Sequence, residues 1–268
     1  MNLLKHLEQE FKIRRYSQKT AKNYLHYNQK FLLYCNKEVN TVTVNDIRNY
    51  LESLANKNSS ASTMRAAYNA LQFFYRDVLR TKLMDSIKIP KNDYKLTIGL
   101  TKKEVSNLIQ AIKNPKHKLL LELIYASGVR AQEAVKIKVK DILTEENVVV
   151  IRAGKGRRDR KTILSDKFVN NFKEQNDSNA YLFPGRNGPL TTRSVQQIIK
   201  QAAKKVGITK RVYPHLLRHA FATHLFQNDV KTEHIQRLLG HKDKKTTERY
   251  ISIHNDEVLK VKSPHDNI

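Results

Sequence analysis

Cysteine is nearly absent from this 268-residue sequence, which contains only Cys35, so no disulfide can form within the chain. A lone thiol fits a protein of a reducing compartment. The first residues lack the hydrophobic stretch of a signal peptide. No uninterrupted apolar run approaches the roughly 20 residues that are needed to span a bilayer. Together these absences predict a cytoplasmic protein with no membrane segment.

Acidic residues are also scarce relative to basic ones. Asp and Glu number 25 against 50 Lys and Arg, which gives a formal net charge of +25. An excess of this size fits a polyanionic partner, because each phosphate contact releases counterions. A basic host proteome or an extreme habitat is the alternative explanation. The sign of the charge alone does not distinguish DNA from RNA or from an anionic membrane.

Four amphipathic helices are predicted in the first ninety residues, where apolar side chains recur at helical spacing between short polar segments. The N-cap candidates for the second, third and fourth helices are Ser17, Thr43 and Ser60 or Ser62. The segment that follows Pro90 has no periodic apolar face and reads as a linker. We therefore expect a helical domain at 1–90, a linker at 91–97 and a second domain at 98–268.

The second domain is predicted to combine helices with a small sheet. Residues 101–104 carry a capping-box signature that opens its first helix. Two β-branched runs, 148–151 and 162–164, flank a turn rich in glycine and basic residues at 154–158, which indicates a β-hairpin. The remainder is mainly helical. The predicted fold class is therefore mainly α with a small β-sheet.

Residues suited to phosphodiester chemistry occur in one order along this second domain. Cleaving a phosphodiester without a metal needs a nucleophile, cations for the non-bridging oxygens, an acid for the leaving alkoxide and an acceptor for the nucleophile's proton. Six residues could together fill these roles. They are Arg130, Lys155, His215, Arg218, His241 and Tyr250.

Arg130 and Arg218 suit the non-bridging oxygens, because a guanidinium is planar, always charged and bidentate. Arg130 follows a Ser–Gly turn just before a predicted helix. Arg218 lies three residues after His215, on a helix that Pro214 would start. The free N–H groups and the positive dipole end of that helix start also favour a phosphate.

His215 can accept or donate a proton near neutral pH. His219 lies four residues further on, which is a spacing that also occurs in metal sites. The usual metalloprotease pattern needs Glu after the first histidine, and Leu216 stands there instead, so we predict no metal. His241 directly follows Gly240, which can end a helix in a left-handed cap and so fix where His241 points.

Tyr250 is the candidate nucleophile and Lys155 the candidate acid. A phenol has a pKa near 10 and needs a cationic pocket to attack at neutral pH. Lys155 lies on the predicted hairpin tip among other cations, which can lower its pKa. Basic residues of the hairpin are candidates for DNA contacts. They are Arg157, Arg158 and Arg160.

This set of residues resembles the catalytic set of the tyrosine recombinase (phage integrase) family, and the short two-domain layout resembles its Xer branch in archaea or bacteria. The segments that carry the resemblance are Ser127–Glu133, His215–His219, Leu239–His241 and Arg249–Tyr250. The resemblance spans essentially the whole chain and is densest from Thr101 to Ile253. The sequence departs from the family at Gln132 and Leu216, neither of which carries the chemistry.

The resemblance implies an N-terminal SAM-like helical bundle and a mixed α/β catalytic domain. Tyr250 would join the DNA 3′ phosphate and release a 5′ hydroxyl. Because the bond energy is kept in the phosphotyrosine, no cofactor is required, and the sequence has no P-loop. His215 would assist Tyr250, His241 would donate to a phosphate oxygen, and Glu133 would accept hydrogen bonds from the arginine or histidine groups.

The resemblance further implies double-stranded DNA as the partner and a homotetramer on two recombination sites, weakly associated without DNA. The tail at 256–268 would dock on a neighbouring subunit. The expected function is site-specific strand exchange of the Xer type, which resolves chromosome dimers at cell division. A mobile-element integrase, a type IB topoisomerase-like enzyme and an architectural DNA-binding protein are the alternatives. The sequence does not reveal whether an accessory motor is needed.

Overall fold

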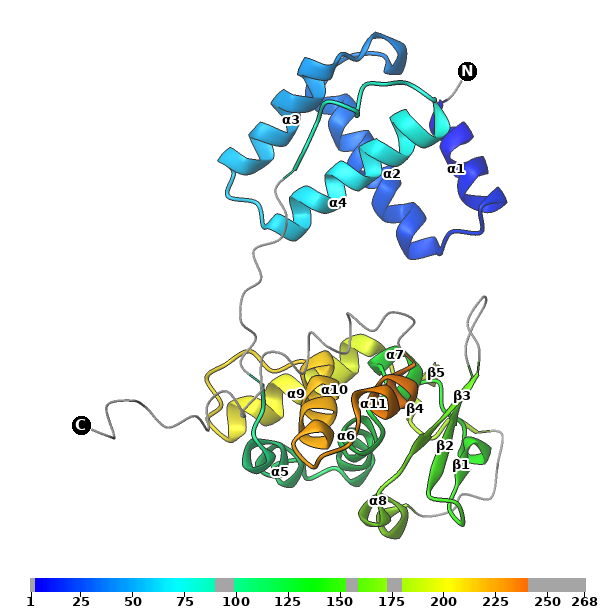
Figure 1. The fold of residues 1–268 in the computed structure, drawn as a ribbon, viewed down its shortest axis with the longest axis vertical. Coiled ribbons are helices and arrows are strands. Elements are labelled where there is room, and N and C mark those ends of the chain that lie inside the picture. Colours follow the sequence, from blue (N-terminus) through cyan, green and yellow to red (C-terminus); the bar gives the residue numbers. More distant parts are fainter. Residues whose placement is uncertain (1–2, 90–98, 153–158, 173–179, 241–268) are drawn as a thin grey trace, which may run out of the picture. The chain divides into compact units, whose positions relative to one another are not determined.

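The structure is a computed structural model, and it describes residues 3–89, 99–152, 159–172 and 180–240. The chain divides into two compact units, residues 1–95 and 96–268, which are described separately (Figure 1). The predicted linker at 91–97 lies outside the described residues, as does the tail at 256–268. No described helix is long and apolar enough to cross a membrane.

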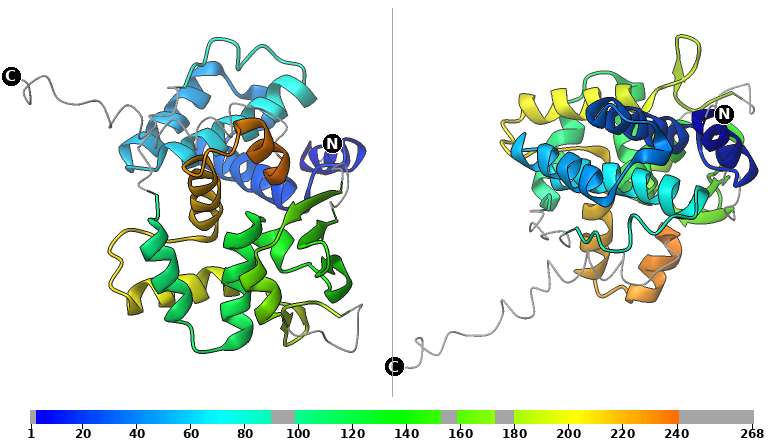
Figure 2. Two further views of the ribbon diagram at one scale, coloured as in Figure 1. Left: turned by 60° about the horizontal axis from the view of Figure 1, so that its bottom comes forward. Right: turned by 90° about the horizontal axis from the view of Figure 1, so that it is seen from above.

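The N-terminal unit is helical, and α2 and α4 lie side by side in it (Figure 2). Its α-helices are α1 (Leu3–Ile13), α2 (Gln18–Cys35), α3 (Val44–Asn56) and α4 (Ala61–Gln72), with a short 3-10 turn, η1 (Val39–Thr41). The side chains of Ser17, Thr43 and Ser60 cap α2, α3 and α4, as predicted. These caps form because each short side chain accepts a hydrogen bond from an N–H group that has no partner inside the helix.

The fourth helix departs from its predicted regular form. After Gln72 the chain continues as a π-helix, η2 (Phe73–Val78). Phe73, Phe74 and Tyr75 are all buried. Three consecutive positions do not share one face of a regular α-helix, and the wider i→i+5 turn accommodates them. Phe73 stacks on Phe11 of α1 at a centroid distance of 5.4 Å, so the π-helix ties the two ends of this unit's chain together.

The second unit surrounds a larger core. Its helices are α5 (Lys102–Gln110), α6 (Pro115–Ser127), α7 (Ala131–Ala134), α8 (Asp166–Asn171), α9 (Thr192–Lys205), α10 (Pro214–Phe226) and α11 (Thr232–Leu239), with a 3-10 turn, η3 (Val139–Asp141). The predicted capping box at the start of α5 forms between Thr101 and Glu104. Helix α6 packs against α10, and the sheet lies beside α6 and α11 (Figure 1).

The sheet is antiparallel in the order β1 (Ile142–Leu143), β2 (Val148–Ile151), β3 (Arg160–Ile163). Strand β2 has its predicted bounds, whereas β3 begins two residues before the predicted run, because Arg160 pairs with Ile151 at the end of β2. The predicted hairpin tip at 154–158 lies outside the described residues. A second pair, β4 (Pro184–Gly185) with β5 (Gly188–Pro189), was not predicted, since two-residue strands with proline leave no alternating pattern.

Candidate active site

Two helix ends meet at the centre of the second unit. Helix α6 ends at Gly128 and α11 ends at Gly240, and both glycines are left-handed, with φ of 61° and 64°. A Cβ at Gly128 would collide with the ring of Phe221, and a Cβ at Gly240 would lie 2.7 Å from Cδ of Arg160. Glycine is therefore required at both positions for two reasons, backbone conformation and close packing.

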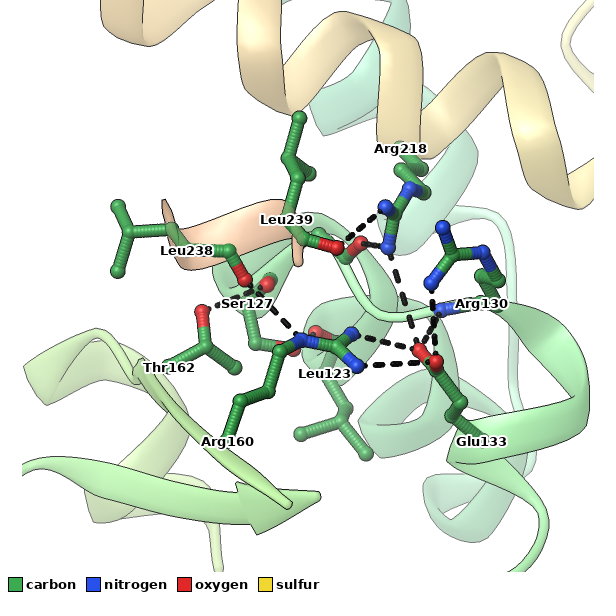
Figure 3. Close-up of polar contacts among 10 residues, drawn as sticks. Leu123, Ser127, Arg130, Glu133, Arg160, Thr162, Arg218, Leu238 and Leu239 are labelled. Carbon is green, nitrogen blue, oxygen red and sulfur yellow. Dashed lines mark hydrogen bonds and ion pairs between the residues drawn. The ribbon is translucent and has the colours of Figure 1, made fainter. Parts of the chain in front are cut away.

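Arg218 of α10 joins these two helix ends. Its Nη1 donates to the carbonyl oxygen of Gly128 at 2.6 Å, and its Nη2 donates to that of Leu239 at 2.7 Å (Figure 3). The side chain is fully buried. A buried guanidinium needs such acceptors, and the last carbonyl groups of a helix lack partners within it and carry the negative end of the dipole. The fold thus fixes Arg218 rigidly.

Glu133 of α7 is the carboxylate around which the arginines gather. Its Oε1 accepts from Nη1 of Arg130 and Nη1 of Arg160, both at 3.0 Å. Its Oε2 accepts from Nη2 of Arg160 at 2.7 Å and from the backbone N–H of Arg130 at 2.9 Å. Nη1 of Arg218 lies 3.9 Å from the same Oε2. One carboxylate therefore faces three guanidinium groups from three separate elements of the chain (Figure 3).

The arginines keep Glu133 ionised. Burial acts to raise the pKa of this carboxyl group, but hydrogen bonds from Arg160 and from the backbone of Arg130, with the positive charges of both, outweigh it and lower the pKa to about 2. Three guanidinium charges then face one carboxylate charge, so this group of four residues retains an excess of positive charge. That excess suits a bound phosphate.

Arg130 is the most accessible arginine of the group. It occupies the N-cap position of α7, directly after the Gly128 turn, as predicted. Its side chain is 32% exposed, against 14% for that of Arg160 and 0% for that of Arg218. A guanidinium that is held by one N–H on a carboxylate, with other N–H groups available, can still bind a second anion.

His215 lies one turn before Arg218 on α10, which Pro214 starts as predicted. His215 as a whole residue is exposed, yet partial burial of its imidazole lowers the pKa of His215, and the positive charges of Arg218 and Arg130 add to the shift. The imidazole is therefore neutral at pH 7 and can accept a proton. His219 is buried, and the described residues contain no cluster of three or more groups that could hold a metal ion.

Arg160 is the residue whose contacts the sequence did not predict. From the sequence, Arg160 is expected to contact DNA, and that contact stays a prediction. In the structure its side chain is 14% exposed and donates hydrogen bonds to Glu133 and to the carbonyl oxygen of Leu238. The period of a strand is two, so Arg160 shares a face with the buried Thr162. That alternation was the available signal that the side chain points inward.

Half of the predicted catalytic set lies outside the described residues. The three are Lys155, His241 and Tyr250, and the predicted DNA contacts Arg157 and Arg158 lie there too. The structure brings together Arg130, Arg218, His215 and Glu133, of which the two arginines and the histidine were predicted as catalytic. Gly240, which has the predicted left-handed conformation, immediately precedes His241 in the sequence.

Comparisons with known proteins show the family of the chain. The phage integrase family matches residues 99–257, and the N-terminal SAM-like domain of phage integrases matches residues 3–85. The tyrosine recombinase XerA of Pyrococcus horikoshii is 31% identical over 246 residues, which cover 88% of this chain and 84% of that protein. An integrase/recombinase of Escherichia coli is 27% identical over 316 residues, covering 99% of this chain and 94% of its own length.

A solved structure shows the same fold. The crystal structure of the XerH site-specific recombinase bound to difH substrate superposes with a TM-score of 0.71 at 20% sequence identity, over 92% of this chain and 79% of that chain. The predicted fold class, a SAM-like helical domain followed by a mixed catalytic domain, is confirmed. The chain therefore belongs to the phage integrase family and is a tyrosine recombinase, an enzyme that breaks and rejoins DNA at specific sites.

Proposed function

We propose that Tyr250 is the nucleophile of this recombinase and that Arg130 and Arg218 bind the scissile phosphate. The observation that carries the proposal is the convergence of Arg130 and Arg218 on one ionised carboxylate, with His215 beside them. Arg218 is held by two helix ends and cannot turn away. Rigid cations that are aimed at developing charge stabilise a transition state without reorganising.

In the proposed reaction, the Tyr250 oxygen attacks the phosphorus atom and the bond from phosphorus to the 5′ oxygen breaks. The phenol proton passes to neutral His215, and Lys155 gives a proton to the leaving 5′ oxygen. His241 donates a hydrogen bond to a non-bridging oxygen. The product is a 3′-phosphotyrosyl bond, which a 5′ hydroxyl can attack in reverse, so neither a nucleotide nor a metal is consumed.

The finer assignment is Xer-type recombination of two DNA sites by four subunits, with resolution of chromosome dimers as the outcome, in the cytoplasm. The similarity to a relative named XerA supports this, and the lone cysteine fits a reducing compartment. A mobile-element integrase is the second candidate. This second candidate is supported by the similarity to a relative named integrase/recombinase, which extends over 99% of this chain.

One selection tests both the chemistry and the assignment. Nicked duplexes carrying genomic fragments are incubated with the protein, and covalent adducts that survive denaturation are recovered and sequenced. Adducts at one chromosomal locus support dimer resolution, and adducts at the ends of an element support the integrase. Adducts spread without sequence preference would contradict a site-specific recombinase, and an absence of adducts would contradict the tyrosine chemistry.

A further inference from the structure

Arg160 occupies a junction between three segments of the catalytic unit. It is the first residue of β3, and its guanidinium bonds both oxygens of Glu133 on α7. Its Nε donates to the carbonyl oxygen of Leu238, near the end of α11, at 3.3 Å. Its Cδ packs where a Cβ at Gly240 would stand. One side chain therefore connects the hairpin strand, the helix that follows Arg130 and the helix that precedes His241 (Figure 3).

A second contact holds the same strand against the site. Oγ1 of Thr162, two residues along β3, donates to the carbonyl oxygen of Ser127 at 3.0 Å, next to the glycine that accepts from Arg218. Thr162 is buried. Strand β3 is thus attached to the site through both Arg160 and Thr162. The hydrogen bond of Thr162 helps to fix the backbone from which the Arg160 side chain extends to Glu133.

The shape of the Arg160–Glu133 pair determines where Arg130 is held. A guanidinium that donates two parallel N–H groups fixes the plane of a carboxylate, which a lysine ammonium cannot do. Oε1 of Glu133 accepts from Arg160 and Arg130 at the same distance of 3.0 Å. If the carboxylate turned, the acceptor of Arg130 would move with it. The side chain of Arg130 is 32% exposed, so packing holds it less firmly than it holds the buried Arg218.

We propose that Arg160 is a positioning residue of the cleavage reaction: its bidentate pair with Glu133 fixes the carboxylate that orients Arg130, and its bond to Leu238 keeps the end of α11 in register with it. This inference rests on the proposed role of Arg130 in binding the scissile phosphate. Arg160 acts through protein groups, and DNA affinity is not its main contribution. Arg130 is the group it places, and Glu133 is the intermediary.

The first test is Arg160→Lys, which keeps the positive charge but removes the guanidinium that donates two parallel N–H groups to Glu133. The substrate is a nicked duplex selected from wild-type covalent adducts, and single-turnover cleavage is measured at saturating protein. A misplacement of about 1 Å can cost roughly 100-fold in rate, so we expect a loss of about 10- to 100-fold. DNA affinity and its salt dependence should stay close to the wild-type values, because the number of positive charges is unchanged.

The matched control is Arg152→Lys. Arg152 follows β2 and pairs with Asp141, but its side chain is 59% exposed and no described contact joins it to Glu133. The same substitution there should leave the cleavage rate near that of the wild type. Melting temperatures show whether each variant is folded at the assay temperature. Arg160→Gln, which keeps an N–H donor toward Glu133, is measured in the same way in case Arg160→Lys is not folded.

A double-mutant cycle identifies the route of the effect. If Arg160 acts through Glu133, adding Arg160→Lys to Glu133→Gln should slow cleavage by less than about twofold, since interacting residues are not additive. A 5′-bridging sulfur provides a better leaving group and bypasses the acid, and it should not rescue Arg160→Lys, because the proposed defect lies at the non-bridging oxygens.

Several outcomes would overturn the inference. The first is a wild-type cleavage rate for Arg160→Lys, and the second is a loss of DNA affinity or salt dependence without a loss of cleavage rate. The third is additive effects of Arg160→Lys and Glu133→Gln on the cleavage rate. The fourth is full rescue of Arg160→Lys by the substrate with a 5′-bridging sulfur. The failure of the underlying function looks different. In that case the wild-type protein itself would form no covalent adduct, or Arg130→Ala would cleave at the wild-type rate.

Discussion

At the scale of single residues, Arg218 serves the fold and the proposed chemistry with the same bonds. Its two carbonyl acceptors belong to the ends of α6 and α11. The same two hydrogen bonds therefore fix the position of the guanidinium and connect the ends of the two helices. Removing a buried, hydrogen-bonded charge leaves its acceptors without donors. The site is therefore rigid, because Arg218, its most buried cation, also connects two helix ends.

Arg218→Lys should lower the free energy of unfolding by about 2–5 kcal/mol, because an ammonium cannot donate to both carbonyl oxygens as the two Nη groups of the guanidinium do. Urea unfolding of the two proteins measures the difference. Arg76→Lys is the control, since Arg76 pairs with Asp77 at an exposed site, where solvent screens the pair and its contribution to stability is small. Equal losses at the two positions would show that Arg218 has no special structural role.

Glu133 makes a pH-dependent contribution whose sign follows from its pKa. The folded pKa is about 2 and the ordinary value is 4.5, so the ionised form is stabilised by folding. That stabilisation is fully present above pH 4.5 and is lost as the pH falls toward 2. The stability advantage of the wild type over Glu133→Gln should therefore shrink by about 2 kcal/mol between pH 5 and pH 3.

Urea unfolding at several pH values measures this change. The matched control is Glu146→Gln, which removes a carboxylate from an exposed pair with Lys161. A wild-type advantage that stays constant from pH 5 to pH 3 would mean that the three arginines do not stabilise the charge of Glu133.

At the scale of elements, the sequence predicted what depends on local chemistry. Ser17, Thr43 and Thr101 cap their helices because a hydroxyl and an adjacent N–H group are all that a cap needs. The early start of β3 follows from the pairing of Arg160 with Ile151 in the same hairpin. The π-helix at Phe73–Val78 depends on which distant groups it meets, and no local signal encodes that. The pairing of Arg160 with Glu133 joins residues 27 positions apart and was missed for the same reason.

The left-handed end of α11 gives a prediction at this scale. Gly240→Ala and Gly207→Ala both force alanine into positive φ, at a cost of about 1–3 kcal/mol. A Cβ at Gly207 meets nothing within 4 Å, whereas one at Gly240 meets the Arg160 side chain. Gly240→Ala should therefore be the less stable variant in urea unfolding, and it alone should slow single-turnover cleavage. Equal stability and equal rates would show that the contact with Arg160 is unimportant.

At the scale of the whole molecule, the net charge of +25 predicts binding to DNA that weakens steeply with salt. Arg157→Ala should flatten the plot of log affinity against log salt by roughly one unit if Arg157 contacts a phosphate. Arg157→Lys keeps the charge and should keep the slope. Fluorescence anisotropy across a salt series measures both, and an unchanged slope for the alanine variant would remove Arg157 from the DNA interface.

The central claim is that Tyr250 becomes covalently joined to a 3′ phosphate of DNA in a pocket built around Arg130 and Arg218. The most direct test incubates the wild type and Tyr250→Phe with a radiolabelled nicked duplex and separates the products under denaturing conditions. The account predicts a protein–DNA band for the wild type whose peptide digest contains phosphotyrosine at residue 250, with no band for the variant and similar DNA binding by both. A denaturation-resistant band from Tyr250→Phe would contradict it.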